Sequence, residues 1–174
     1  MAVVIRCKPM RAALTVLVLL VAGTLSCSSQ KVFTLPNNAM EPTILNGEKF
    51  AVEMKPFQPA RGDLVVFERD GLLLVKRVIA VAGDTIQGHN NEIFLNGSLI
   101  SERYIQHIGL LPPFATFGPV TISTSKVFVA GDNRDYSFDS RSPEHGLIST
   151  GDIKGRPLKI VESSNRQRVD KPLQ

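Results

Sequence analysis

The side chain with the clearest potential for chemistry is Lys76. Apolar residues precede it at Leu72–Val75 and follow it at Val78–Ile79. A lysine amine acts as a base only when it is neutral, so its pKa must fall from about 10.4 toward 7, and desolvation by apolar neighbours lowers the pKa of an amine. The alternative is that Lys76 lies on the solvent face of a strand, as most lysines do.

Three clusters of residues around this lysine carry more information than the lysine itself. They are Leu35–Ile44 with Gly47, Arg61–Phe67 running into Val75–Thr85, and Val127–Arg141. The last contains Gly-Asp-Asn-Arg-Asp followed by Asp-Ser-Arg, which together form a highly specific signal. In this order and spacing the clusters resemble the type I signal peptidases, membrane-bound serine endopeptidases that cut signal sequences from exported proteins. The resemblance covers residues 36 to about 161.

The resemblance implies a Ser/Lys dyad in which Lys76 is the general base. In the family a serine stands immediately before Met-x-Pro-Thr, and this chain has Ala39 at that position. A methyl group cannot attack a carbonyl, so the sequence offers a base without its nucleophile. Thr43 matches a structural threonine of the family and is not a substitute.

The resemblance also assigns the groups around the dyad. Asn37 stands where the family has a hydroxyl residue that forms the oxyanion hole with the backbone N–H of position 39, and its side-chain amide can still donate. Ser137 matches the serine that orients the lysine. Asp139 and Arg141 match a charged pair that supports the site, whereas the alternative for Asp139 is an ordinary polar turn.

Two explanations of Ala39 stay open, an engineered substitution that traps substrate and a native alanine. We favour the native residue, because the chain retains an apolar export segment and carries no tag. Three functions follow: a signal-peptidase-like serine endopeptidase that is inactive as written, a native pseudo-peptidase that binds exported peptides or envelope partners without cleavage, and an envelope lipoprotein that uses the fold as a scaffold.

The partners implied by the resemblance are signal peptides or exported proteins with small residues before the cut. Such a peptide would lie extended beside strand edges near Val32–Pro36 and Val75–Val78. Membrane lipid is the second expected partner, because the N-terminal segment is apolar.

Residues 1–30 have the pattern of a signal or membrane-anchor segment. Three cations, Arg6, Lys8 and Arg11, precede an uncharged apolar run at Ala12–Leu25. This run is predicted to form the one apolar helix of the chain. A helix of this run rises only about 21 Å, short of the roughly 30 Å hydrocarbon core. The residues around Cys27 look like a bacterial lipoprotein processing site. Either form tethers the body to a membrane on the extracytoplasmic side, since the cations stay in the cytoplasm.

Charge and cysteine content exclude several classes of function. The chain has 20 Lys plus Arg against 16 Asp plus Glu, a net charge of +4, and three of the cations precede the apolar run. The nearly neutral remainder argues against nucleic acid as a partner. With only two cysteines, on opposite sides of the apolar run, a disulfide framework and a four-ligand zinc site are excluded. An EF-hand-like loop fails because Arg134 and Tyr136 stand where oxygen ligands are needed. We expect no metal and no cofactor.

The remaining pattern predicts a mainly β fold, an antiparallel signal-peptidase-like catalytic domain over residues 31–162. Short runs rich in Val, Ile and Phe predict strands at Phe50–Met54, Asp63–Glu68, Leu72–Val81, Ile93–Leu95 and Lys126–Ala130. Asn96-Gly97 predicts a hairpin turn. We expect a loop at Gly109–Pro119, a polar, flexible tail at residues 163–174, and surface positions for His89, His107 and His145.

Overall fold

The computed structural model describes residues 29–105 and 114–173. The expected N-terminal helix, Cys27 and His107 therefore lie outside the described residues. Within the described ranges, no helix has the length and apolar character needed to cross a membrane.

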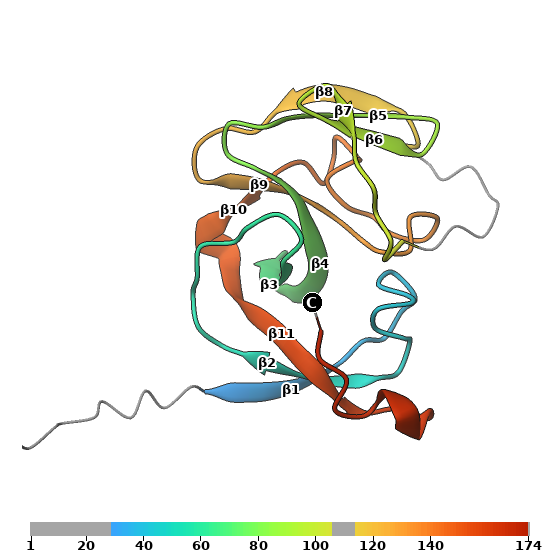
Figure 1. Cartoon of the computed structure of the whole chain (residues 1–174). Coiled ribbons are helices and arrows are strands. Elements are labelled where there is room, and N and C mark those ends of the chain that lie inside the picture. The colour runs from blue at the N-terminus through green and yellow to red at the C-terminus, as the bar shows by residue number, and fades with distance from the viewer. Residues whose placement is uncertain (1–28, 106–113, 174) are drawn as a thin grey trace, which may run out of the picture.

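Two antiparallel sheets build this part of the chain (Figure 1). The larger sheet has seven strands in the order β1-β2-β11-β3-β4-β9-β10, with bounds Gln30–Thr34, Lys49–Glu53, Ile153–Glu162, Leu64–Arg69, Leu72–Val81, Lys126–Ala130 and Ile148–Ser149. The smaller sheet has the order β7-β6-β5-β8, with bounds Ser98–Leu99, Glu92–Leu95, Thr85–His89 and Phe117–Thr121. Two short 3₁₀ turns follow late in the sequence, η1 at Thr150–Asp152 and η2 at Arg166–Arg168. The prediction of a mainly antiparallel β domain is confirmed.

The strongest local signals in the sequence coincide with the observed elements. Strand β4 has the predicted bounds, and β6 and β7 form a hairpin around Asn96 and Gly97. Both turn residues have positive φ, 52° and 81°. A tight two-residue hairpin turn needs that conformation at both positions, which Asn and Gly adopt at low cost.

Part of the expected loop is a strand. Residues 109–113 lie outside the described ranges, but Phe117–Pro119 belong to β8, so the expectation of a loop was wrong there. Strand β8 pairs with β5, and the Phe117 ring stacks on Phe128 with centroids 5.2 Å apart. This pairing joins segments far apart in the sequence, which the local pattern does not reveal.

Strand β11 was not expected either, because its Gly155 and Pro157 weaken the local strand signal. The glycine has a structural reason. A Cβ at Gly155 would lie 2.1 Å from the carbonyl oxygen of Glu53 on the neighbouring β2. Only glycine therefore allows the two backbones to approach this closely.

One part of the hydrophobic core includes residues from the loop between β1 and β2. Leu35, Met40 and Ile44 pack with Phe50, Val52 and Val66. Met40 is fully buried, so it is an ordinary core residue. The loop that carries positions 37 and 39 is thus fixed to the larger sheet by its own apolar side chains.

Candidate active site

Lys76 lies in the middle of β4, paired with Val65 of β3, and only 6% of it is exposed. Burial lowers the pKa of its amine, and the positive charge of Arg141 acts in the same direction. Asp139 and Asp132 oppose this shift, but desolvation is the larger effect. The neutral form of this amine is therefore more favoured here than it is in water.

Lys76 lines a groove of about 220 Å³ that runs between β1 and the start of β4. The lining is mostly apolar and includes Thr34, Leu35, Asn37 and Leu74. Among the described strands, β1 pairs only with β2, and β9 joins β4 from Arg77 onward, which leaves the outer edge of Leu72–Lys76 unpaired. Two free strand edges consequently flank the groove, close to where the sequence placed them.

Position 39 lies against the loop that follows β9. The carbonyl oxygen of Ala39 accepts a hydrogen bond from the backbone N–H of Asn133 at 3.1 Å. A Cβ at Gly131 would lie 2.4 Å from that carbonyl oxygen and 2.3 Å from Oγ of Ser137. The structure thus brings Ala39, Gly131 and Ser137 together, and only glycine fits between them.

The side chain of Asn37 contacts the backbone of position 39 through its oxygen atom. The backbone N–H of Ala39 donates to Oδ1 of Asn37 at 3.0 Å. This N–H is the one that the resemblance assigns to the oxyanion hole. In this structure the side chain of Asn37 caps the donor that would have to bind a developing oxyanion.

Ser137 and Thr43 provide no replacement for the missing nucleophile. Oγ of Ser137 is enclosed within the protein. It lies close enough to Asp139 to help lower the pKa of that carboxyl. Oγ1 of Thr43 donates to Asp132, so this hydroxyl is already engaged.

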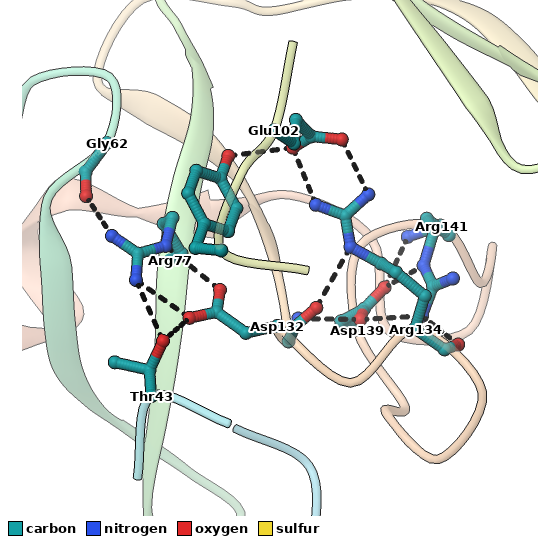
Figure 2. Close-up of polar contacts among 10 residues, drawn as sticks. Thr43, Gly62, Arg77, Glu102, Asp132, Arg134, Asp139 and Arg141 are labelled. Carbon is teal, nitrogen blue, oxygen red and sulfur yellow. Dashed lines mark hydrogen bonds and ion pairs between the residues drawn. The ribbon is translucent and has the colours of Figure 1, made fainter. Parts of the chain in front are cut away.

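The pair of Asp139 and Arg141 closes the loop after β9 (Figure 2). Nε of Arg141 donates to Oδ1 of Asp139 at 2.8 Å, and its NH2 group also binds the carbonyl oxygens of Arg134 and Ser137. Burial alone would raise the pKa of Asp139, but the hydrogen bonds and charge of Arg141 hold it below its ordinary value. The carboxylate is therefore charged and orders the loop beside Lys76.

A second buried ion pair joins β4 to the same loop (Figure 2). Nε and NH2 of Arg77 donate to the two carboxylate oxygens of Asp132 at 2.9 and 2.7 Å, and NH1 donates to the carbonyl oxygen of Gly62. Arg134 forms a similar two-point contact with Glu102 at 2.6 and 3.0 Å. These planar pairs fix the relative positions of Lys76 and the loop.

Replacing Asp132 by Asn is expected to lower the free energy of unfolding by about 3–5 kcal/mol, because the buried guanidinium of Arg77 would lose its counter-charge. The matched control is Glu162→Gln, since the Lys49–Glu162 pair at 2.8 Å is exposed. We expect the control to cost about 0–1 kcal/mol in urea unfolding. Equal losses in the two variants would contradict the assigned role of Asp132.

The prediction of a surface position was wrong for His145, which is buried, whereas His89 is exposed as predicted. Only 3% of His145 is exposed, and its ring packs edge-on against Phe67 and Phe138. Arg69 donates to its carbonyl oxygen. Burial, reinforced by the charge of Arg69, lowers the pKa of this imidazole. A histidine between polar residues gives no local sign of such burial.

Other buried charges were also missed from the sequence. Glu102 and Glu48 pair with Arg134 and Arg168, and both carboxylates are almost fully enclosed. Their partners are 32 and 120 residues away. No motif marks such pairs, because each belongs to a separate segment.

Comparison with known proteins agrees with this geometry. The family model described as signal peptidase, peptidase S26, matches residues 9–161. Signal peptidase I S of Bacillus subtilis (strain 168) is 32% identical over 146 residues, covering 78% of this chain and 79% of its own. Signal peptidase I P of Bacillus subtilis subsp. natto is 36% identical over 136 residues, covering 71% and 72%.

A solved structure gives a further likeness. The signal peptidase I from Enterococcus faecalis V583 is 25% identical, with a TM-score of 0.49, and the match covers 59% of this chain and 98% of that chain. Because the family model matches most of this chain, residues 9–161, and these relatives are more than 30% identical to it, the chain belongs to the signal peptidase family, peptidase S26.

Proposed function

We propose that this protein binds extended, signal-peptide-like segments of exported proteins and does not cleave them by the Ser/Lys route. The observation that carries the proposal is the groove between the free edges of β1 and β4, which is retained up to Lys76 while position 39 is a methyl group. Peptide recognition and peptide cleavage are thus separable in this chain.

Binding would use the backbone first. An extended peptide placed in the groove pairs with the unpaired N–H and C=O groups of Gln30–Thr34 and Leu72–Lys76, in the manner of an added strand. The groove holds about 220 Å³ between apolar walls, which favours short apolar side chains over long or charged ones. This selection agrees with the small residues that the family resemblance implies.

The absence of cleavage would have two causes. No hydroxyl is attached at position 39, and the hydroxyls of Thr43 and Ser137 are engaged or enclosed. In addition, the N–H of Ala39 is capped by Asn37. We infer from these contacts a pseudo-peptidase, in which Lys76 would still serve as base if a nucleophile were supplied.

The cellular position follows from the N-terminal pattern. Three cations before an apolar run would tether the chain to a membrane, with the β domain on the extracytoplasmic side, where exported proteins emerge. The tether would be a retained anchor or a lipid on Cys27, and lipid is then the second partner.

A peptide with alanines at the positions before the expected cut tests this function. We expect it to bind the unaltered chain in isothermal calorimetry and to be recovered intact by mass spectrometry. Thr34→Trp fills the groove and should weaken binding at least about tenfold. Thr121→Trp is the matched control, because this exposed threonine lies on β8 of the smaller sheet, and it should change the affinity less than about twofold.

Two results would contradict the proposal. Recovery of cut peptide would show that the chain has another catalytic route. A lack of binding by the unaltered chain would favour the lipoprotein scaffold, in which the groove has no ligand.

A further inference from the structure

The segment Ser163–Leu173, which we call the strap, lies after β11 and beyond the residues matched by the family model. It folds back along that strand. The N–H of Asp170 donates to the carbonyl oxygen of Ile160 at 2.8 Å, and the N–H of Leu173 donates to Leu158 at 2.8 Å. Leu173 is buried in the same cluster as Met40 and Ile44. The segment expected as a flexible tail is packed against the sheet in this structure.

One side chain of the strap reaches the loop before β2. Nε of Arg168 donates to Oε1 of Glu48 at 2.6 Å, and NH2 donates to Oε2 at 3.0 Å. The same NH2 group lies 2.9 Å from the carbonyl oxygen of Thr43 and 3.2 Å from that of Pro42. Arg168 therefore binds three residues of the loop Asn37–Glu48 at once.

Glu48 is the centre of this contact. Only 3% of it is exposed, and it also accepts hydrogen bonds from the N–H of Leu45 at 2.8 Å and from Oγ of Ser163 at 2.6 Å. Burial would raise the pKa of this carboxyl, but the hydrogen bonds of Arg168 and Ser163 lower it. A charged carboxylate inside the protein needs all of these donors.

The loop held in this way is the one that carries the site. Its positions 39 and 43 are fixed on one side by Asn133 and Asp132, which belong to the family motif after β9. On the other side its carbonyl groups are fixed by Arg168. In Figure 1 the red strap lies beside the loop that leads into β2. Loss of Arg168 would remove this anchor and leave the loop held by the motif and by the packing of its own apolar side chains.

We propose that Arg168 is a positioning residue of this site, which fixes the loop Asn37–Glu48 so that positions 37 and 39 keep their place relative to Lys76. For peptide chemistry this rests on the proposed function, whereas the anchoring of the loop is independent of it. None of the hydrogen bonds of Arg168 named above involves β1 or β4, the two strands that wall the groove. We therefore expect substitution of Arg168 to leave the affinity for peptide nearly constant.

Hydrogen exchange of the loop amides tests the anchoring without any peptide. The N–H groups of Ile44, Leu45, Gly47 and Glu48 are hydrogen-bonded within this region. In Arg168→Lys, which keeps the charge but cannot bind Glu48 and two carbonyls together, we expect their exchange to accelerate at least about tenfold. The matched control is Asp170→Asn in the same strap, which removes the exposed ion pair between Asp170 and Lys159 of β11. This variant should leave the exchange of these amides unchanged.

A kinetic readout separates positioning from simple stability. In a chain with Ser at positions 37 and 39, Arg168→Lys should lower kcat by about 10–100-fold while KM changes less than about twofold. Unchanged exchange in Arg168→Lys, or equal acceleration in Asp170→Asn, would overturn the proposal. If the unaltered chain binds no peptide, the proposed function fails, and the exchange result alone decides the role of Arg168.

Discussion

Ala39→Ser combined with Asn37→Ser is expected to convert this chain into a peptidase, at least about 100-fold faster than Ala39→Ser alone. The single substitution supplies a nucleophile, but Asn37 still occupies the backbone N–H of position 39. Removing one oxyanion-hole donor costs about 10²–10³ in kcat in well-studied proteases. The second serine removes the cap and supplies a hydroxyl donor. Cleavage of a peptide with small residues before the cut is measured by mass spectrometry.

Asn37→Ser alone is the control for this experiment and should show no cleavage, because it lacks the nucleophile. Equal rates for Ala39→Ser and the double variant would show that the Asn37 contact does not limit catalysis. No cleavage by either would show that the site has lost more than its hydroxyl, and would leave peptide binding as its only function.

Lys76→Met in the double variant is expected to abolish most of that activity, by about 10²–10⁴-fold, since the substitution removes the general base. Before the substitution, kcat/KM should rise with pH as the amine of Lys76 loses its proton. Because burial lowers the pKa of this amine, the rise should occur below the range of free lysine, near 10.4. The pH profile measured from pH 5 to 10 checks both statements.

The same substitution should stabilise the fold. Lys76 has a folded pKa below its unfolded value, so the unfolded chain binds more protons between the two and stability rises with pH across that window. The cost of burying the ammonium is fully present below the folded pKa and disappears above the unfolded one. Lys76→Met should therefore unfold at higher urea than the unaltered chain at pH 6, and this gain should vanish toward pH 11. Lys49→Met, at an exposed position, should show no such pH-dependent gain.

The sequence predicted the fold where local signals were strong. A run rich in Leu, Val and Ile predicted the correct bounds of Leu72–Val81, and Asn96-Gly97 marked a hairpin turn. Strand β11 was missed because Gly155 and Pro157 hide it, although Gly155 is required by the approach of β2. The local sequence pattern does not reveal such contacts, because the residue that requires the glycine lies on a distant segment.

The candidate site could likewise be predicted from the sequence only in part. Lys76, Ala39, Ser137 and Asp139 were predicted as site residues from their clusters, and the structure brings the corresponding segments together. The direction of the Asn37 hydrogen bond could not be predicted, because an amide side chain both donates and accepts. Arg168 gave no signal, since its partner Glu48 lies 120 residues earlier in the chain.

We infer that the amine of Lys76 loses its proton more readily inside the groove than in water, beside a position that carries a methyl group in place of a hydroxyl. The most direct test is an NMR titration of the Lys76 side chain in the unaltered protein, assigned with Lys76→Met. We expect its amine to titrate clearly below the range of a free lysine. Titration near about 10.4 would show a solvated ammonium and would contradict the account.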